Sequence, residues 1–228
     1  ISHELRWQSL DSSKVQWLLG AYAYIDDAQA NPNVSLDGSL RRTLETFGDN
    51  KNNAYALFAQ GTAPFGEKRR LTLGGRYSRE TQDWTGYTQA YVAATGAAGA
   101  RTTFPQKSAT WSKFTPKAVI DYKITPDAML YLSYSQGFKA GVFNIGSPTA
   151  PGPVNPENLN AYELGLKSEF MNRRLRVNAA AFSYDYSDLQ VQSRVPDPLS
   201  PGNANILLQN AANAKLYGLE VDTELAAT

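Results

Sequence analysis

The feature that most constrains this chain is an alternation of apolar and polar residues with a period of two. In the segment AKLYGLEVDTEL, Tyr217, Leu219 and Val221 occupy alternate positions, and Glu220 and Asp222 lie between them. Successive side chains of a strand point to opposite faces, whereas a helix would spread these two sets around its circumference. The segment therefore predicts a β-strand with one apolar face and one charged face.

The same alternation recurs along the chain, for example in FTPKAVIDYK (114–123), AYELGLKSEF (161–170) and RLTLGGRYSRE (70–80). These segments, with the turn residues between them, predict about nine strands and an all-β fold. Their approximate spans are 1–10, 15–27, 53–64, 69–83, 109–124, 128–140, 159–170, 174–195 and 206–227.

The predicted connections alternate between short and long. Short turns are expected at 10–14, 65–69, 125–127 and 171–174, and long polar segments at 28–53, 85–108, 141–158 and around 196–202. This asymmetry is typical of an antiparallel up-and-down transmembrane β-barrel, with short periplasmic turns and long extracellular loops. No apolar run approaches the roughly 18 residues that indicate a membrane-spanning helix.

An odd number of strands predicts a portion of a larger barrel. Bacterial single-chain barrels close with even numbers of strands, and an open edge in hydrocarbon leaves backbone groups without hydrogen bonds. Two alternatives remain open at this point. One is a passive porin-like channel, and the other is a soluble all-β domain with one wet face.

The composition argues against several classes of function. The 22 basic and 21 acidic residues give a net charge of +1, which offers no basis for a nucleic-acid partner. The chain has no cysteine and a single histidine, His3, so a thiolate or multi-histidine metal site is excluded. We therefore predict no catalytic residues, no metal ligands and no cofactor, and we expect the protein not to be an enzyme.

Several segments, taken together, resemble the barrel of TonB-dependent outer-membrane receptors. They are YLSYSQGFKAGVFN (131–144), PENLNAYELGLKSEF (156–170), RRLRVNAAAFSYDYSDLQV (173–191) and NAANAKLYGLEVDTEL (210–225), and the resemblance covers essentially the whole chain in order. It implies a barrel of about 22 strands in the bacterial cell outer membrane, filled by an N-terminal plug. It also implies import of a scarce ligand, such as a ferric siderophore, with energy passed from TonB.

The resemblance also sets expectations for domains and partners. Residues 1–228 are expected to be part of the barrel domain, with the plug domain and the TonB box absent from this sequence. Outer-membrane lipid is the expected direct partner of the strands. TonB and the plug are expected partners only through missing parts of the parent chain, so this piece alone should neither transport nor couple to TonB.

If the apolar faces meet lipid, the charged faces line the barrel interior. Leu219 and Val221 should then lie on the convex side of a curved sheet, and Glu220 on the concave side. Both signs of charge are present, which favours a solvated, mutually neutralising wall over a selectivity ring of one charge. The predicted lumen-facing residues are Arg76, Glu80, Lys117, Asp121, Glu163, Lys167, Glu169, Glu220, Asp222 and Glu224.

Aromatic residues are plentiful, with thirteen Tyr, nine Phe and four Trp. Tyr and Trp favour the membrane–water interface, where the ring is in apolar surroundings and the polar tip is wet. Girdle positions are predicted for Tyr122, Tyr131, Tyr134, Tyr162, Phe170 and Tyr217. Within the segment 131–144, Gly137 and Gly141 are expected to loosen the strand where it leaves the membrane.

The long loops are the predicted place for ligand contacts. Exposed tryptophans beside these loops, together with tyrosine and arginine side chains, suit an aromatic or anionic ligand such as a catecholate. The alternative is a polar surface loop without a ligand. The candidate ligand-binding residues are Trp84, Tyr87, Tyr91, Arg101, Trp111 and Phe143.

Overall fold

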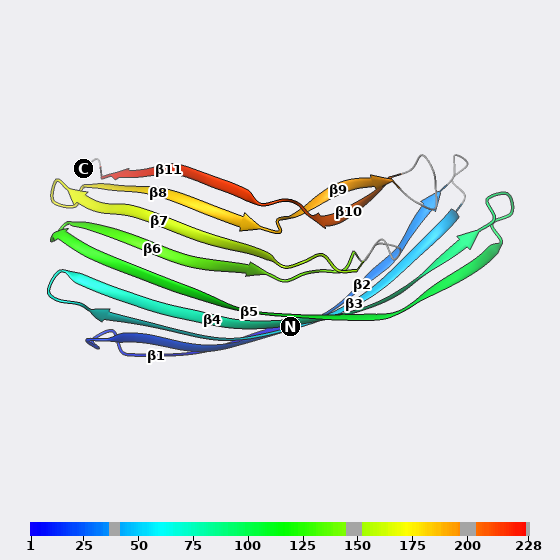
Figure 1. The fold of residues 1–228 in the computed structure, drawn as a ribbon, viewed down its shortest axis with the longest axis horizontal. Coiled ribbons are helices and arrows are strands. Elements are labelled where there is room, and N and C mark those ends of the chain that lie inside the picture. The colour runs from blue at the N-terminus through cyan, green and yellow to red at the C-terminus, as the bar shows by residue number, and fades with distance from the viewer. Residues whose placement is uncertain (37–41, 145–151, 197–203, 227–228) are drawn as a thin grey trace.

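The computed structural model describes residues 1–36, 42–144, 152–196 and 204–226. Figure 1 shows them as one long curved β-sheet with a small hairpin at one end. None of the described residues forms a helix that is long and apolar enough to cross a membrane. The strands are β1 (Ser2–Gln8), β2 (Gln16–Leu36), β3 (Arg42–Pro64), β4 (Arg69–Tyr91), β5 (Ala98–Thr125), β6 (Ala128–Lys139), β7 (Glu157–Phe170), β8 (Leu175–Ser187), β9 (Gln190–Pro196), β10 (Ala204–Asn210) and β11 (Ala214–Leu225).

Nine of these strands form one sheet in the order β1-β2-β3-β4-β5-β6-β7-β8-β11, and every neighbouring pair is antiparallel. The predicted nine-stranded, up-and-down architecture is therefore confirmed. Tight turns join β1 to β2, β3 to β4, β5 to β6 and β7 to β8 at one end of the sheet (Figure 1). These are the four turns predicted at 10–14, 65–69, 125–127 and 171–174.

Strands β2 to β5 are much longer than predicted, with 21, 23, 23 and 28 residues. The segments 28–53 and 85–108, which were expected to be long loops, are mostly paired strand. Alternation marks a strand only where one face is apolar. Beyond the apolar part of the sheet both faces are polar, so the ladder hydrogen bonds continue without an alternating pattern.

The predicted strands 174–195 and 206–227 are each two strands. β8 ends before Asp188, whose φ of 55° breaks the extended backbone, and β9 begins at Gln190. Asn210 Nδ2 donates a hydrogen bond to Asp188 O at 2.7 Å, at the base of the β9–β10 hairpin. This hairpin is a separate two-stranded sheet beyond the ends of β8 and β11 (Figure 1).

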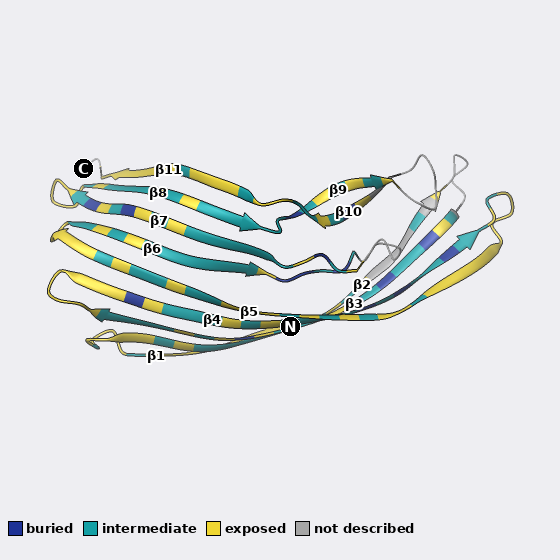
Figure 2. Ribbon diagram, in the orientation of Figure 1, coloured by how far each residue is buried: buried dark blue, intermediate teal, exposed yellow. Residues whose placement is uncertain are grey.

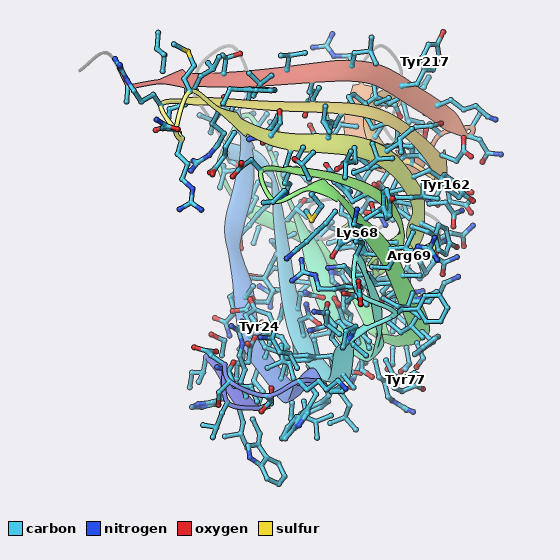
Figure 3. The ribbon with its side chains drawn as sticks, turned by 90° about the vertical axis from the view of Figure 1, so that its left-hand side faces the viewer. Tyr24, Lys68, Arg69, Tyr77, Tyr162 and Tyr217 are labelled. Atoms are coloured by element: carbon cyan, nitrogen blue, oxygen red, sulfur yellow. The ribbon has the colours of Figure 1, made fainter. Side chains whose placement is uncertain are left out.

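The register of the sheet separates an apolar face from a polar one. Leu219 pairs with Ala181, and Ala181 pairs with Leu164, so these three residues share one face. The sheet is curved, and Figure 3 shows Tyr77, Tyr162 and Tyr217 on its convex side, the side of this apolar row. Tyr24 pairs with Ala54 of β3, a position on the other face of the sheet, and it lies on the concave side.

Three aromatic rings lie against glycines on neighbouring strands of the concave face. The pairs are Phe58 over Gly20, Tyr131 over Gly165, and Phe182 over Gly218, and each pair consists of register partners. A Cβ at any of these glycines would come within 3 Å of the ring. Glycine therefore leaves room for the rings on the crowded inner side of the curved sheet.

The buried core does not lie between two sheets but near the ends of β3 and β4, away from the tight turns (Figure 2). There the chain that follows β6 packs with the side chains of β4 and β5. The buried apolar residues of the described chain include Trp84, Ala140, Phe143, Val154 and Leu207. The apolar residues of the convex face are largely exposed by contrast, with Leu219 82% and Val221 71% accessible.

Candidate functional site: the concave wall and its hollow

The strand register places the ten charged residues that were predicted to face the lumen on one face of the sheet. Glu220 follows the row of Gly165 and Tyr131, and Lys117 follows the row of Ser135 and Ala161. All ten lie on the face opposite the apolar row, which is the concave face. That they line the lumen of a closed barrel stays a prediction, because the described chain forms only part of such a wall.

Two arginines that the sequence analysis did not single out hold part of this wall together. Arg70 pairs with Asp121 at 3.1 Å, across β4 and β5. Arg176 pairs with Glu169 at 3.3 Å and with Glu224 at 3.1 Å, and so connects three strands. These ion pairs neutralise part of the charge on the concave face.

A hollow of about 520 Å³ opens on the concave face where β2, β3 and β4 pass beneath the chain that follows β6. Arg76 lines it, and its guanidinium lies 5.3 Å from the centroid of the Tyr22 ring and 5.5 Å from that of the Phe58 ring. Cation–π contacts of this kind hold an arginine in place while its N–H groups remain available as donors. Arg76 Nε donates to Ser78 Oγ at 3.0 Å.

Polar side chains form the rest of the hollow. Asn52 Nδ2 donates to Glu80 Oε1 at 3.1 Å, and Gln82 Nε2 donates to the same oxygen at 3.4 Å. Tyr24 and Lys139 also line the hollow. The site therefore presents a cation, aromatic rings and several hydrogen-bonding groups within one concave surface.

The segment after β6 closes one side of the hollow. Gln190 Nε2 donates to Ala140 O at 2.9 Å and to Asn155 O at 3.0 Å, so one side chain holds both ends of the segment. Gly141 packs against the Trp111 ring, where a Cβ would lie 2.5 Å from Trp111 Cζ2. β6 stays paired through Gly137 and ends at Lys139, before Gly141. That the strand leaves the membrane at this level stays a prediction.

The expectation of an exposed Trp84 is wrong, because only 2% of this residue is accessible. Its ring centroid lies 6.2 Å from Phe104 and 6.4 Å from Phe143, and the Lys107 ammonium lies 5.3 Å from the ring. Phe143 is also buried. Trp84 lies on the concave face, where the segment after β6 covers it. Trp84 and Phe143 therefore pack between the sheet and that segment, a contact that their separation in the sequence did not reveal.

Trp111 is half-buried and lies on the concave face, paired in register with Glu80. It borders the hollow through its contact with Gly141, and Phe143 borders it through a hydrogen bond from its backbone N–H to Gln82 Oε1 at 3.4 Å. The residues that sequence reasoning missed are Tyr22, Asn52, Gln82 and Gln190. Their alternate positions along the strands could have indicated that they lie on the concave face. Those positions could not have indicated that they meet around one hollow.

Tyr87, Tyr91 and Arg101 lie on the other face of the sheet. The uninterrupted register of β3 with β4 places Tyr87 on the same face as Tyr77. Tyr87 Oη donates to Glu45 Oε1 at 2.9 Å, and Tyr91 Oη donates to Glu45 Oε2 at 3.0 Å. Arg101 stacks 4.2 Å from the Tyr87 ring centroid. These three residues thus form a cluster around Glu45, away from the hollow.

This cluster lies beyond the apolar part of the sheet, ten residues further along β4 than Tyr77. The hydrogen bond to the Glu45 carboxylate, with some burial, raises the pKa of the Tyr87 phenol above its usual value of 10.0. The positive charge of Arg101 opposes this shift. A role in ligand binding for the six candidate residues stays a prediction.

Comparison with known proteins supports the same reading of the fold. Residues 2–227 match the family described as TonB dependent receptor-like, beta-barrel. The metal-pseudopaline receptor CntO of Pseudomonas aeruginosa is 29% identical over 169 residues, which are 74% of this chain and 21% of that protein. The chain therefore spans about a fifth of this curated relative.

Solved structures share the fold at lower sequence identity. The ferric yersiniabactin uptake receptor FyuA from Yersinia pestis superposes with a TM-score of 0.80 at 21% identity, over 100% of this chain and 32% of that chain. The ferric-catecholate import receptor Fiu from E. coli K12, in its closed form, gives a TM-score of 0.67 at 15% identity, over 100% of this chain and 35% of that chain. With the family match over residues 2–227, the chain belongs to the TonB-dependent receptor β-barrel family, whose members are bacterial outer-membrane transport proteins.

Proposed function

We propose that the parent protein imports a ferric siderophore or a similar metal chelate across the outer membrane, with energy passed from TonB. Residues 1–228 supply part of the barrel wall, and other parts of the parent chain supply the plug domain and the TonB box. Two of the similar proteins are named for ferric ligands and one for metal-pseudopaline, which supports this class of ligand. The proposal gives this chain no enzymatic role.

The hollow around Arg76 is the observation that carries the proposal. An anionic chelate with aromatic groups needs a cation for its charge and rings or flat surfaces for its faces. Arg76 offers the cation, and Tyr22 and Tyr24 offer the rings, on a wall that is otherwise balanced in charge. Lys139 lines the same hollow, and Trp111 lies beside it, against Gly141.

The experiment uses the full-length parent receptor in a bacterial strain that lacks its own siderophore receptors. Uptake of radioactive iron is measured with catecholate, hydroxamate and carboxylate chelates, in the presence and absence of TonB. We expect uptake of one chelate class, and its loss without TonB. Uptake that continues undiminished without TonB would instead indicate a passive porin-like channel, the alternative that the sequence left open.

A substitution tests the hollow itself. Arg76→Gln removes the cation and is expected to raise the chelate concentration that gives half-maximal uptake. Lys123→Gln is the matched control, since Lys123 is exposed beside the tight turn after β5. Equal uptake curves for Arg76→Gln and the unaltered receptor, at equal receptor abundance, would contradict a ligand role for the hollow.

A further inference from the structure

The convex face carries a groove with a floor of small residues. Ala21 and Ala23 on β2, Ala59 on β3 and Gly75 on β4 are on this face, and the register makes Ala59 the partner of Gly75. Because these residues have small side chains or none, the surface is hollowed along a diagonal across three strands. Larger side chains form the walls: Leu5, Trp7, Leu57, Tyr77 and Phe114.

Two adjoining hollows make up this groove. One has a volume of about 540 Å³ and the other of about 490 Å³, and they share Leu5, Ala21, Leu57 and Tyr77. The part from Leu19 to Ala23 alone extends about 13 Å along β2. The Phe114 ring lies over Gly75 and closes one end. The lining is almost wholly apolar, so the groove suits a hydrocarbon chain.

The other end of the groove is polar. His3 and Arg79 lie there, on the side toward the long β2–β3 and β4–β5 hairpins. Arg79 pairs in register with Tyr55 and is therefore on the convex face. Among the described residues, Arg79 makes no ion pair and no side-chain hydrogen bond. Glu4, at the edge of the same hollow, is paired with Arg6 instead.

An exposed arginine without an acidic partner, directly beyond a band of apolar residues, attracts an anion at the membrane surface. The apolar groove that starts beside it removes a hydrocarbon chain from contact with other lipid chains and packs it against Ala21 and Leu57. Both requirements are met by one molecule that has an anionic head and an acyl chain. A neutral lipid would leave Arg79 without a counter-charge.

We propose that this groove, defined by Ala21, Ala23, Ala59 and Gly75 with Arg79 at its polar end, binds an anionic phosphorylated lipid of the surrounding leaflet. The phosphate accepts hydrogen bonds from the Arg79 guanidinium and from His3, and one acyl chain lies along the alanine floor. The long hairpins belong to the extracellular side of receptors in this family, so the lipid is one of the outer leaflet. This site lies on the opposite face of the sheet from the ligand hollow, and Tyr22, Tyr55 and Arg79 border both hollows.

The head-group contact is tested on the full-length parent receptor. The receptor is incorporated into vesicles of equal parts phosphatidylglycerol and phosphatidylcholine, extracted in mild detergent, and examined by native mass spectrometry for retained lipids. We expect phosphatidylglycerol to be retained in excess. Arg79→Gln should bring the ratio of the two lipids down to that of the vesicles, whereas Arg79→Lys should keep part of the preference. Lys113→Gln, on the opposite face of the adjacent strand, is the control.

The acyl-chain contact needs a second variant. Ala21→Phe fills the groove floor with an apolar ring that lipid tolerates, and is expected to reduce the number of retained lipids. Val221→Phe, on the convex face far from the groove, should leave it unchanged. Heat-modifiable migration on gels checks that each variant is folded.

Three results would overturn the proposal. The first is a lipid ratio that is the same for Arg79→Gln and Lys113→Gln. The second is full lipid retention in Ala21→Phe, which would mean that charge alone holds the lipid at the surface. The third is release of phosphatidylglycerol by free inorganic phosphate or by self-association of the receptor, which would assign the groove to an ion or to a second copy of the chain.

Discussion

The ring of Tyr131 on β6 covers Gly165, its register partner on β7, and occupies the space that a side chain at residue 165 would need. The Tyr131 hydroxyl donates to Glu163, and the Lys167 ammonium lies 5.4 Å from the ring. Tyr131 was predicted to belong to an aromatic girdle, and this is wrong because its register places it on the concave face. Tyr134 and Tyr162, whose ring centroids are 5.1 Å apart, do lie on the convex face.

The first prediction concerns this close approach. Gly165→Ala forces the Tyr131 ring away from the strand and is expected to destabilise the folded barrel by about 1–3 kcal/mol, as overpacking does. Gly61→Ala is the control, because a Cβ there meets no atom within 4 Å. Urea unfolding of the parent receptor in lipid vesicles, followed by tryptophan fluorescence, measures both. Equal losses in the two variants would show that the ring is not the cause.

The second prediction tests which face meets lipid. Val221→Arg places a charge on the convex face and is expected to cost about 2–4 kcal/mol if it lies near the bilayer midplane. Asp222→Arg, its neighbour on the concave face, should change the free energy of unfolding by no more than about 0.5 kcal/mol. The same unfolding experiment in vesicles measures the pair. A larger loss for Asp222→Arg would reverse the assignment of the faces.

The third prediction concerns the segment that closes the hollow. Gln190 is buried and donates to Ala140 O and Asn155 O, so Gln190→Leu leaves two carbonyl groups without this donor. We expect a loss of about 1–3 kcal/mol in local stability and faster hydrogen exchange at 140–144 and 152–156. Gln192→Leu on the same strand is exposed and serves as the control. Unchanged exchange in Gln190→Leu would mean that other contacts hold the segment.

The fourth prediction concerns pH. The hydrogen bond from Tyr87 to Glu45 raises the pKa of the phenol in the folded protein above 10.0. This hydrogen bond therefore contributes its full stabilisation of the fold below pH 10, and the stabilisation is lost as pH rises through the raised pKa. The difference in ultraviolet absorbance between the parent receptor and its Tyr87→Phe variant reports ionisation of the Tyr87 phenol. Its midpoint should therefore lie above pH 10. In a Glu45→Gln background this difference should titrate at lower pH. A midpoint that Glu45→Gln does not move would exclude the carboxylate as the cause.

The sequence by itself determined which segments form the strands of the apolar part of the sheet. It also determined which side chains of those strands share a face. Leu164, Leu219 and Val221 alternate with Glu163, Glu220 and Asp222, and a period of two leaves only one way to separate these sets. The tight turns and the nine-stranded order followed from the same pattern, because short connections make neighbouring strands antiparallel. The full lengths of β2 to β5 did not follow, since no alternation marks a strand whose two faces are both polar.

Only the tertiary structure decided what meets on each face. Trp84 and Phe143 are 59 positions apart, yet the segment after β6 buries both, and Gln190 holds that segment from another hairpin. Tyr22, Arg76 and Gln190 share one hollow for the same reason, because strand pairing joins distant parts of the chain. Parity along a strand predicts which face a side chain occupies. Its neighbours on that face depend on register and curvature, which no local pattern contains.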